Sequence, residues 1–235
     1  MRFTVDLHAH TISSGHAYST IKEYADEAAQ KGLELIAITD HAPNMPGSAG
    51  FLHFLNLKNM PRVINGVELL LGVELNILDQ DGTIDLEKGI VKKLDLVIAS
   101  LHLPCIKAGT REENTKAVIC AMKNPLIDII GHLGDPRYPI DIEAVVKAAK
   151  DTNTIIELNN ASLNPYGSRA GGDEIILKLL QACKEKEVSI SLGSDAHIYS
   201  DIGNFDNLTD ILAQANLPGD LIVNTSKEKT KQFIQ

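Results

Sequence analysis

The chain carries eight histidines, and seven of them come at or just after the ends of short apolar runs. Neutral imidazole nitrogens bind Zn²⁺, Mn²⁺ and Fe²⁺, and carboxylate oxygens often complete such sites. Two acids have matching positions, because Glu74 follows LLLGV and Asp195 follows SISLGS. We therefore expect a metal centre, and its candidate ligands are His8, His10, His16, His41, Glu74, His102, His132, Asp195 and His197.

The spacing and the number of these residues say more about the centre. His8 and His10 are two residues apart on a predicted strand, so they point the same way, and Asp195 and His197 share that spacing. A single histidine at a strand end is usually a surface or hydrogen-bonded residue, but so many titratable groups together would be costly without cations. This many ligands suit two or three metals with open positions for water and a bridging carboxylate, as in a reactive site.

Short β-branched runs alternate with amphipathic stretches along the chain, a pattern typical of parallel strands joined by helices. Helical segments are predicted at 19–31, 142–150 and 174–186. Such a sheet is buried on both faces, and it is either open or closed into a barrel. The carboxyl ends of its strands meet on one side, which would gather the candidate ligands there. The predicted strands are Phe3–Leu7, Leu35–Thr39, Leu69–Val73, Leu96–Ser100, Ile127–Gly131, Thr154–Leu158 and Ser189–Gly193.

Composition excludes several classes of protein. The 235 residues are 44% hydrophobic and 23% charged, with no linker or low-complexity tract, so we expect a single globular domain over residues 1–235. The apolar runs are too short to span a membrane. The start, MRFTVDLHAH, lacks the apolar core of a signal peptide, and three cysteines without paired spacing fit a reducing compartment, so we expect a cytoplasmic protein. The net charge of -9 would repel nucleic acid.

The motifs that carry the histidines resemble those of the PHP (polymerase and histidinol phosphatase) superfamily of metallohydrolases. The resemblance covers almost the whole chain, with the motifs in the right order. The length of the chain is similar to that of the stand-alone bacterial phosphatases of this superfamily. It implies an α/β fold, a distorted, TIM-like (β/α)7 barrel with the metal site at the carboxyl ends of the strands. The motifs are DLHAHT at 6–11, His16, ITDH at 38–41, GVELN at 72–76, SLH at 100–102, GHLGDP at 131–136 and GSDAH at 193–197.

The resemblance also implies how the ligands divide among three metals, most simply Zn²⁺, with Mn²⁺ or Fe²⁺ as alternatives. Three divalent ions and two carboxylates leave a charge of about +4, which would attract a phosphate monoester. A hydroxide that bridges the metals would then attack phosphorus, so the expected activity is that of a phosphoric ester hydrolase. The implied sets are His8, His10, Glu74 and Asp195 for the first metal, Glu74, His102 and His132 for the second, and His16, His41 and His197 for the third.

Residues outside the ligand set have weaker assignments. Arg169, in NPYGSRAGGD, is a candidate for phosphate binding, because a guanidinium matches two phosphate oxygens. Asp40 is a candidate catalytic residue that would hydrogen-bond a ligand histidine or a metal-bound water, and Asn76, Asn159 and Asp135 could act in the same way. The segment 42–61, rich in Pro and Gly, sits where an active-site lid would, and its His53 reads as a lid or packing residue.

Two other functions stay open at this point. The same metals could serve a phosphodiesterase or nuclease, and the scaffold could be a non-catalytic, metal-binding regulatory protein. The expected partner is a small phosphorylated substrate, with no membrane and no nucleic acid, and assembly into a homo-oligomer is compatible with the sequence.

Overall fold

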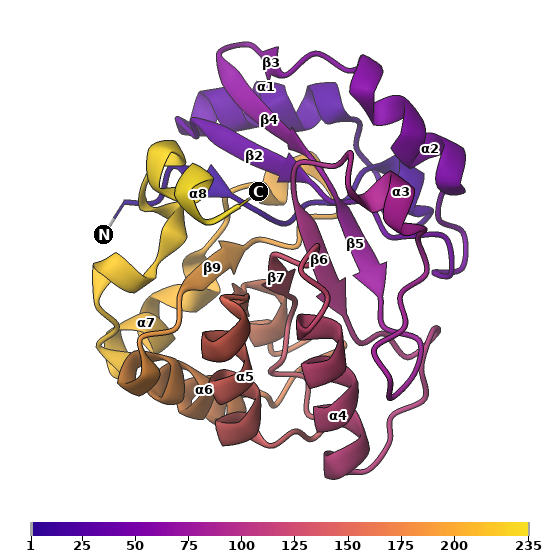
Figure 1. Cartoon of the computed structure of the whole chain (residues 1–235). Helices are drawn as coiled ribbons and strands as arrows, with labels where there is room; N and C mark the ends of the chain where they lie inside the picture. The colour runs from indigo at the N-terminus through magenta and orange to yellow at the C-terminus, as the bar shows by residue number, and fades with distance from the viewer. Residues whose placement is uncertain (1, 235) are drawn as a thin grey trace.

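The computed structural model describes residues 2–234, which form an α/β fold with parallel strands and helices packed outside them (Figure 1). One sheet has the order β1-β2-β4-β3 and the other the order β5-β6-β7-β8-β9, and only the β3–β4 pair is antiparallel. Every predicted strand overlaps a strand of the structure. The strands are β1 Val5–Asp6, β2 Leu35–Ile38, β3 Val63–Ile64, β4 Val67–Leu71, β5 Val73–Asn76, β6 Val97–Ser100, β7 Ile129–Ile130, β8 Ile155–Asn159 and β9 Ile190–Gly193.

The helices begin and end where local chemistry allows. The predicted segment 19–31 becomes a helix only from Ile21, because the Thr20 side chain caps Glu23 and the Glu23 side chain caps Thr20 in return. The other two predicted segments are also helical. Helices α4, α5 and α6 pack against one another in chain order (Figure 1). The helices are α1 Ile21–Lys31, α2 Phe51–Asn56, α3 Lys88–Val91, α4 Arg111–Met122, α5 Ile142–Thr152, α6 Asp173–Lys186, α7 Thr209–Ala215 and α8 Lys227–Phe233.

The run predicted as one strand at 69–73 is two strands in the structure. It breaks at Gly72, so β4 pairs with β2 while β5 pairs with β6. A Cβ at Gly72 would lie 2.3 Å from the carbonyl oxygen of Leu96, so only glycine allows this close approach of the two chains. The break carries Glu74 into the second sheet, beside the strands that bear the later histidines.

A hairpin that our sequence reading missed precedes this break. β3 pairs with β4 through the two-residue turn Asn65–Gly66, whose φ values are 50° and 82°. Both values are positive, as a type I′ turn requires, and Asn-Gly is the dipeptide that favours this turn. The Asn-Gly signal was therefore present in the sequence.

The two sheets meet at the ends that carry the candidate ligands. Isolated parallel bridges pair Ala9 with Ala196 and His41 with Glu74, one residue from each sheet or its flanking loop. The segment 42–61, predicted as a lid loop, contains α2 and packs against the loop after β1. A Cβ at Gly15 would lie 2.2 Å from the carbonyl oxygen of Gly47.

The hydrophobic core has two parts. The larger lies between the sheets and the helices. The smaller is formed by alternate residues of strands from both sheets, among them Val5, Leu35, Leu70, Ile98 and Ile155, and Phe233 and Ile234 pack against it. In the part of the chain that the structure describes, no helix combines the length and hydropathy that a membrane crossing needs.

Candidate metal centre

The predicted ligands converge on one cavity of about 350 Å³. They come from the strand ends or the loops directly beyond them, as the parallel arrangement requires. His8 and His10 are completely buried, whereas the others open onto the cavity. The cavity is lined by His16, His41, Glu74, His102, His132, Asp195 and His197 together with Ala161, Asn164, Gly167, Ser168 and Arg169.

One carboxylate oxygen of Glu74 faces the histidines of β1. Glu74 Oε2 lies 3.5 Å from Nε2 of both His8 and His10, and these two nitrogens are 3.0 Å apart. Asp195 Oδ1 lies 3.2 Å from His10 Nε2 and 3.8 Å from His8 Nε2. The donor atoms of His8, His10 and Glu74 thus lie within 4.8 Å of one another, close enough to hold a single cation, and Asp195 lies beside the two histidines.

The other oxygen of Glu74 faces a second pair of histidines. Glu74 Oε1 lies 3.3 Å from His102 Nε2 and 3.0 Å from His132 Nε2, and the two nitrogens are 3.2 Å apart. Glu74 therefore presents one oxygen to each group of histidines.

The remaining histidines lie at the opening of the cavity. The His16 ring centroid is 5.0 Å from that of His41 and 4.9 Å from that of His197. His41 also reaches inward, since its Nδ1 lies 2.7 Å from Glu74 Oε2. The tightest groups of donor atoms accordingly join His41 to His10 and His197, and separately to Glu74 and His102, without including His16.

Hydrogen bonds to the outer nitrogen of several rings leave the inner nitrogen free. His8 Nδ1 contacts Glu157, His102 Nδ1 contacts Asn76 Oδ1 at 2.8 Å, and His197 Nδ1 contacts the carbonyl oxygen of Asp195 at 2.9 Å. All three partners are acceptors, so each ring carries its proton on Nδ1. Nε2 then keeps the lone pair that a metal requires.

Glu157 is a buried residue of the site that the sequence reading did not single out. Its Oε1 lies 2.6 Å from His8 Nδ1, and its Oε2 accepts the backbone N–H of His132 at 2.8 Å and the Asn159 amide at 3.2 Å. It stands in the apolar run TIIELN of β8. A carboxylate inside a buried strand needs polar partners, and that was the signal that could have found it.

The pKa values of Glu74 and Asp195 depend on two opposing effects, burial and the neighbouring side chains. Burial disfavours ionisation of Glu74, yet the imidazoles of His102, His8 and His41 hold its pKa well below its usual value. At Asp195 burial is likewise outweighed, here by His8 and Arg169, and the pKa is well below its usual value. Both carboxylates are therefore ionised at neutral pH and available to cations.

Two of the candidate ligands have left-handed backbone conformations. The φ value is 30° at His132 and 56° at Asp195. Residues with a side chain rarely adopt such values, and they persist where the surrounding structure imposes them. Both turns direct side chains into the cavity.

Arg169, the candidate for phosphate binding, lies beside Asp195 at the wall of the cavity. Its Nη2 pairs with Asp195 Oδ2, and its Nε donates to Ser162 Oγ at 2.9 Å. The guanidinium lines the cavity and is mostly buried. Asp195 and Ser162 hold the guanidinium at the wall of the cavity, where a bound anion could contact it.

The other polar candidates differ in their contacts. Asn76 contacts His102, and Asn159 donates to Asp195 Oδ2 at 3.3 Å. Asp135 instead pairs with Arg137, at 2.6 Å between Oδ2 and Nη2. The hydrogen bonds of Asp40 go to Thr11 and Ser14 rather than to a histidine of the ligand set. We predicted a hydrogen bond from Asp40 to a ligand histidine or to a metal-bound water. Among the described residues, Asp40 approaches the ligand His10 through Ser14, and the contact with a metal-bound water stays a prediction.

The donor set fits divalent transition metals. It consists of imidazole nitrogens and carboxylate oxygens, without cysteine, and the measured separations suit ions between them. His41 Nδ1 and Glu74 Oε2 lie 2.7 Å apart, but both are buried and neither makes a hydrogen bond with the described residues. Buried polar atoms rarely stay unpaired, and a cation would satisfy both.

Comparisons with known proteins agree with this picture. A probable phosphatase of Caldanaerobacter subterraneus subsp. tengcongensis is 52% identical over 236 residues, which covers 100% of this chain and 92% of the relative. A probable phosphatase of Thermoanaerobacter sp. (strain X514) is 50% identical over 236 residues, with 100% and 96% covered.

Solved structures share the fold at low identity. One is histidinol phosphate phosphatase from Lactococcus lactis, solved with Zn, L-histidinol and phosphate; the identity is 17%, the TM-score 0.63, and 99% of this chain and 98% of that chain are covered. A chain of an archaeal ribonuclease P with mature tRNA matches with 15% identity and a TM-score of 0.58, over 97% and 89%. The PHP domain model matches residues 6–232, and the chain therefore belongs to the PHP family.

Proposed function

We propose that this protein is a metal-dependent phosphatase that hydrolyses small phosphate monoesters at a trinuclear zinc centre. The single observation that carries the proposal is the orientation of Glu74, whose Oε2 faces His8 and His10 while its Oε1 faces His102 and His132. A carboxylate that divides its oxygens in this way suits a bridge between two cations.

The ligands then divide as the family resemblance implies. His8, His10, Glu74 and Asp195 would hold the first metal, and Glu74, His102 and His132 the second. His16, His41 and His197 would hold the third, with His41 turning from Glu74 toward the other two rings. We choose zinc because the histidinol phosphate phosphatase that shares this fold was solved with Zn. The imidazole and carboxylate ligands themselves accept Mn²⁺ and Fe²⁺ as well.

The residues of the chain would divide the work of hydrolysis. The metals would supply positive charge and lower the pKa of water. Arg169 binds the phosphoryl oxygens with the part of its guanidinium that faces the cavity, while Asp195 and Ser162 hold the other part in place. Asp195 would thereby orient Arg169 through Oδ2 and offer Oδ1 to the first metal. The hydrogen bonds that Asp40 accepts from Thr11 and Ser14 support a role in holding the loop after β1, which carries His10 to His16.

We also infer that the two sheets form one distorted (β/α)7 barrel. The smaller core supports this, because Val5, Leu35, Leu70, Ile98 and Ile155 come from both sheets and fill one interior. The bridges Ala9–Ala196 and His41–Glu74 lie where the sheets would join. A closed barrel would fix the distances between ligands that come from every strand. An experimental structure with the sheets separated by solvent would contradict this inference.

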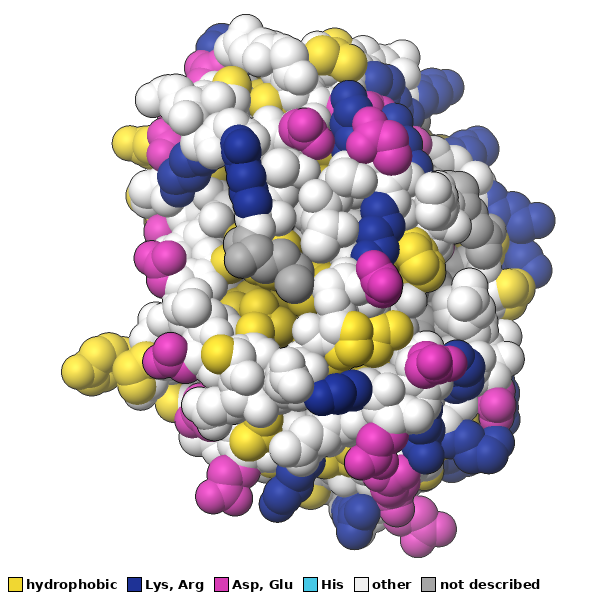
Figure 2. Space-filling model, turned by 90° about the vertical axis from the view of Figure 1, so that its left-hand side faces the viewer, with side chains coloured by type: hydrophobic (Ala, Val, Ile, Leu, Met, Phe, Trp, Pro, Cys, Tyr) yellow, Lys and Arg dark blue, Asp and Glu magenta, His cyan; other side chains and the backbone are white. Residues whose placement is uncertain are grey.

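A nuclease or phosphodiesterase is the main rival, and the surface argues against it. Acidic residues outnumber basic ones, 31 to 22, and on the face in Figure 2 Lys and Arg side chains alternate with Asp and Glu rather than forming a stripe. A polyanion gains little from such a surface. The likeness to a ribonuclease P chain concerns the fold alone. The third function, a non-catalytic metal-holding protein, is opposed by the relatives, which are named probable phosphatases.

The decisive experiment measures metal content and ester preference on the same sample. Protein purified without chelator should contain about three metal ions per chain if each ligand group is filled. It should hydrolyse p-nitrophenyl phosphate with a higher kcat/KM than bis(p-nitrophenyl) phosphate, after correction for intrinsic reactivity, because a monoester offers more charge and more free oxygens to the centre. The preference should persist at moderate salt, since the site is recessed.

The controls separate the three functions. Glu74→Gln should lose more metal and more activity than His197→Ala, because a neutral amide bridges cations poorly. Faster diester cleavage with tight, salt-sensitive DNA binding would favour a nuclease. Full metal content without hydrolysis of any ester would favour the regulatory protein. A panel that includes histidinol phosphate, sugar phosphates and nucleotides would then define the substrate.

A further inference from the structure

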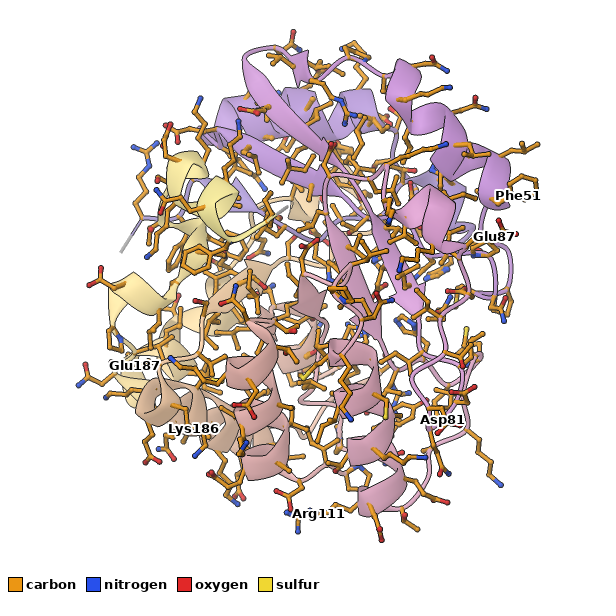
Figure 3. All side chains as sticks on the ribbon, in the orientation of Figure 1. Phe51, Asp81, Glu87, Arg111, Lys186 and Glu187 are labelled. Atoms are coloured by element: carbon orange, nitrogen blue, oxygen red, sulfur yellow. The ribbon has the colours of Figure 1, made fainter. Side chains whose placement is uncertain are left out.

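His53 lies on α2, in the segment 42–61 that the sequence marked as a lid. Phe51 and Leu52 of the same helix are exposed, with Phe51 at the outer edge of the molecule in Figure 3, whereas Phe54 is buried in the core. His53 turns toward the strand ends, and its Nε2 lies 3.4 Å from Oδ2 of Asp40. This nitrogen is buried and makes no hydrogen bond with the described residues, so Oδ2 of Asp40 is the acceptor that it faces.

Asp40 is a buried carboxylate whose remaining contacts are all donors. The Thr11 backbone N–H and the Ser14 hydroxyl donate to Oδ1, each at 2.7 Å, and the Thr11 hydroxyl donates to Oδ2 at 2.8 Å. The Ser14 hydroxyl donates to the same oxygen as the Thr11 backbone N–H, so its single proton is used on Asp40.

The Ser14 hydroxyl oxygen is then left with acceptor capacity only. It accepts the backbone N–H of His41 at 3.1 Å, and it lies 3.2 Å from Nδ1 of His10. With its proton committed to Asp40, Ser14 can only accept from His10, which places the His10 proton on Nδ1. His10 Nε2 is thereby left free toward Glu74 and Asp195.

We propose that His53 is a positioning residue of the metal centre, acting through Asp40 and Ser14 on His10. Its Nε2–H holds Oδ2 of Asp40, so that Oδ1 stays aligned with Ser14 and Thr11. The chain of contacts links α2 to His10, a candidate ligand in the loop after β1. The segment 42–61 therefore acts on the geometry of the first metal site from outside the cavity.

The proposal rests on the metal centre of the proposed function but not on the identity of its substrate. The test uses His53→Leu, which keeps much of the volume and removes the donor, and His53→Gln, whose amide nitrogen can replace Nε2–H. Leu52→Ala on the exposed side of α2 is the matched control. The readouts are Zn²⁺ affinity by chelator competition, the melting temperature of metal-free protein, and kcat/KM with p-nitrophenyl phosphate.

We expect His53→Leu to weaken binding of the tightest zinc by about threefold to tenfold, less than loss of a direct partner of a metal-bound histidine. His53→Gln should restore most of the affinity, and Leu52→Ala should change nothing. The melting temperature of the metal-free protein should be similar in His53→Gln and wild type. A purely structural role would instead lower the melting temperature of His53→Leu while leaving zinc affinity unchanged, and that result would overturn the proposal.

A double-mutant cycle with Asp40→Asn tests the route. If His53 acts through Asp40, His53→Leu should have little further effect on zinc affinity in the Asp40→Asn background. Additive losses would show that His53 acts by another path and would refute the proposal. Wild-type protein that binds zinc but cleaves no ester would end the proposed function, while the chelator competition would still decide the role of His53.

Discussion

Nδ1 of His8 and Oε1 of Glu157 lie 2.6 Å apart, which ties the loop after β1 to β8. The other oxygen of Glu157 accepts the backbone N–H of His132. One buried carboxylate therefore orients a candidate ligand of the first metal and the backbone of a candidate ligand of the second.

Replacing Glu157 should expose this double role. In Glu157→Gln an amide must face either His8 Nδ1–H or the His132 N–H, and both are donors, so one contact is lost. We expect zinc affinity to fall by about tenfold to a hundredfold, as for other partners of metal-bound histidines. Glu185→Gln removes the same charge from an exposed site and is the control. Equal affinities in a chelator competition would show that Glu157 does not orient the ligands.

Arg169 should matter more for substrate than for metal. If Arg169 binds phosphate as proposed, loss of this charge-assisted contact in Arg169→Ala should cost on the order of 2–4 kcal/mol, roughly thirtyfold to a thousandfold in kcat/KM. Arg169→Lys keeps the positive charge but lacks the two-pronged guanidinium, so its kcat/KM should lie between those of wild type and Arg169→Ala. Arg111→Ala is the control, since Arg111 lies exposed on α4 (Figure 3). Because Arg169 also pairs with Asp195, metal content is measured in parallel. A loss of metal equal to the loss of activity would make Arg169 part of the cluster's support instead.

The break between β4 and β5 should be sensitive to a single methyl group. Gly72→Ala places a Cβ 2.3 Å from the Leu96 carbonyl oxygen, so we expect a loss of about 1–3 kcal/mol in the free energy of unfolding. Gly89→Ala in α3 meets no atom within 4 Å and should stabilise by about 0.5–1 kcal/mol. Urea unfolding of the two metal-free variants measures both. A Gly72→Ala protein as stable as Gly89→Ala would contradict the close approach.

The Asp135–Arg137 pair should make stability depend on acid pH. Burial opposes ionisation of Asp135, but hydrogen bonds from Arg137 hold its pKa below the usual value. A carboxylate with a lowered pKa in the folded state stabilises above its ordinary pKa, near 4, and loses this contribution as the pH falls through the folded value. Arg137→Met should therefore cost about 1 kcal/mol at pH 7, because Arg137 is partly exposed, and less at pH 3. Melting temperatures of metal-free wild type and Arg137→Met, measured at pH 7 and pH 3, give the two differences in stability. A larger difference at pH 3 than at pH 7 would contradict the prediction.

Much of this site could be predicted because its ligands obey a simple rule. Parallel strands bring their carboxyl ends to one side of the sheet. Histidines that follow the strands therefore lie on that side, however far apart the strands are in the sequence. The sequence by itself thus determined where the strands lie along the chain, the helix within 19–31 and the convergence of histidines with Glu74 and Asp195 on one side of the molecule.

Only the tertiary structure decided how those ligands are held. That Glu157 contacts His8, that Ser14 lies between Asp40 and His10, and that His53 reaches Asp40 depend on side chains 149, 26 and 13 positions apart. The same holds for the break at Gly72, which depends on the carbonyl of Leu96 in another strand. Periodicity and motif spacing describe one segment at a time. Orientation of a ring and close approach of two backbones depend on packing between segments, and packing is decided when the whole chain folds.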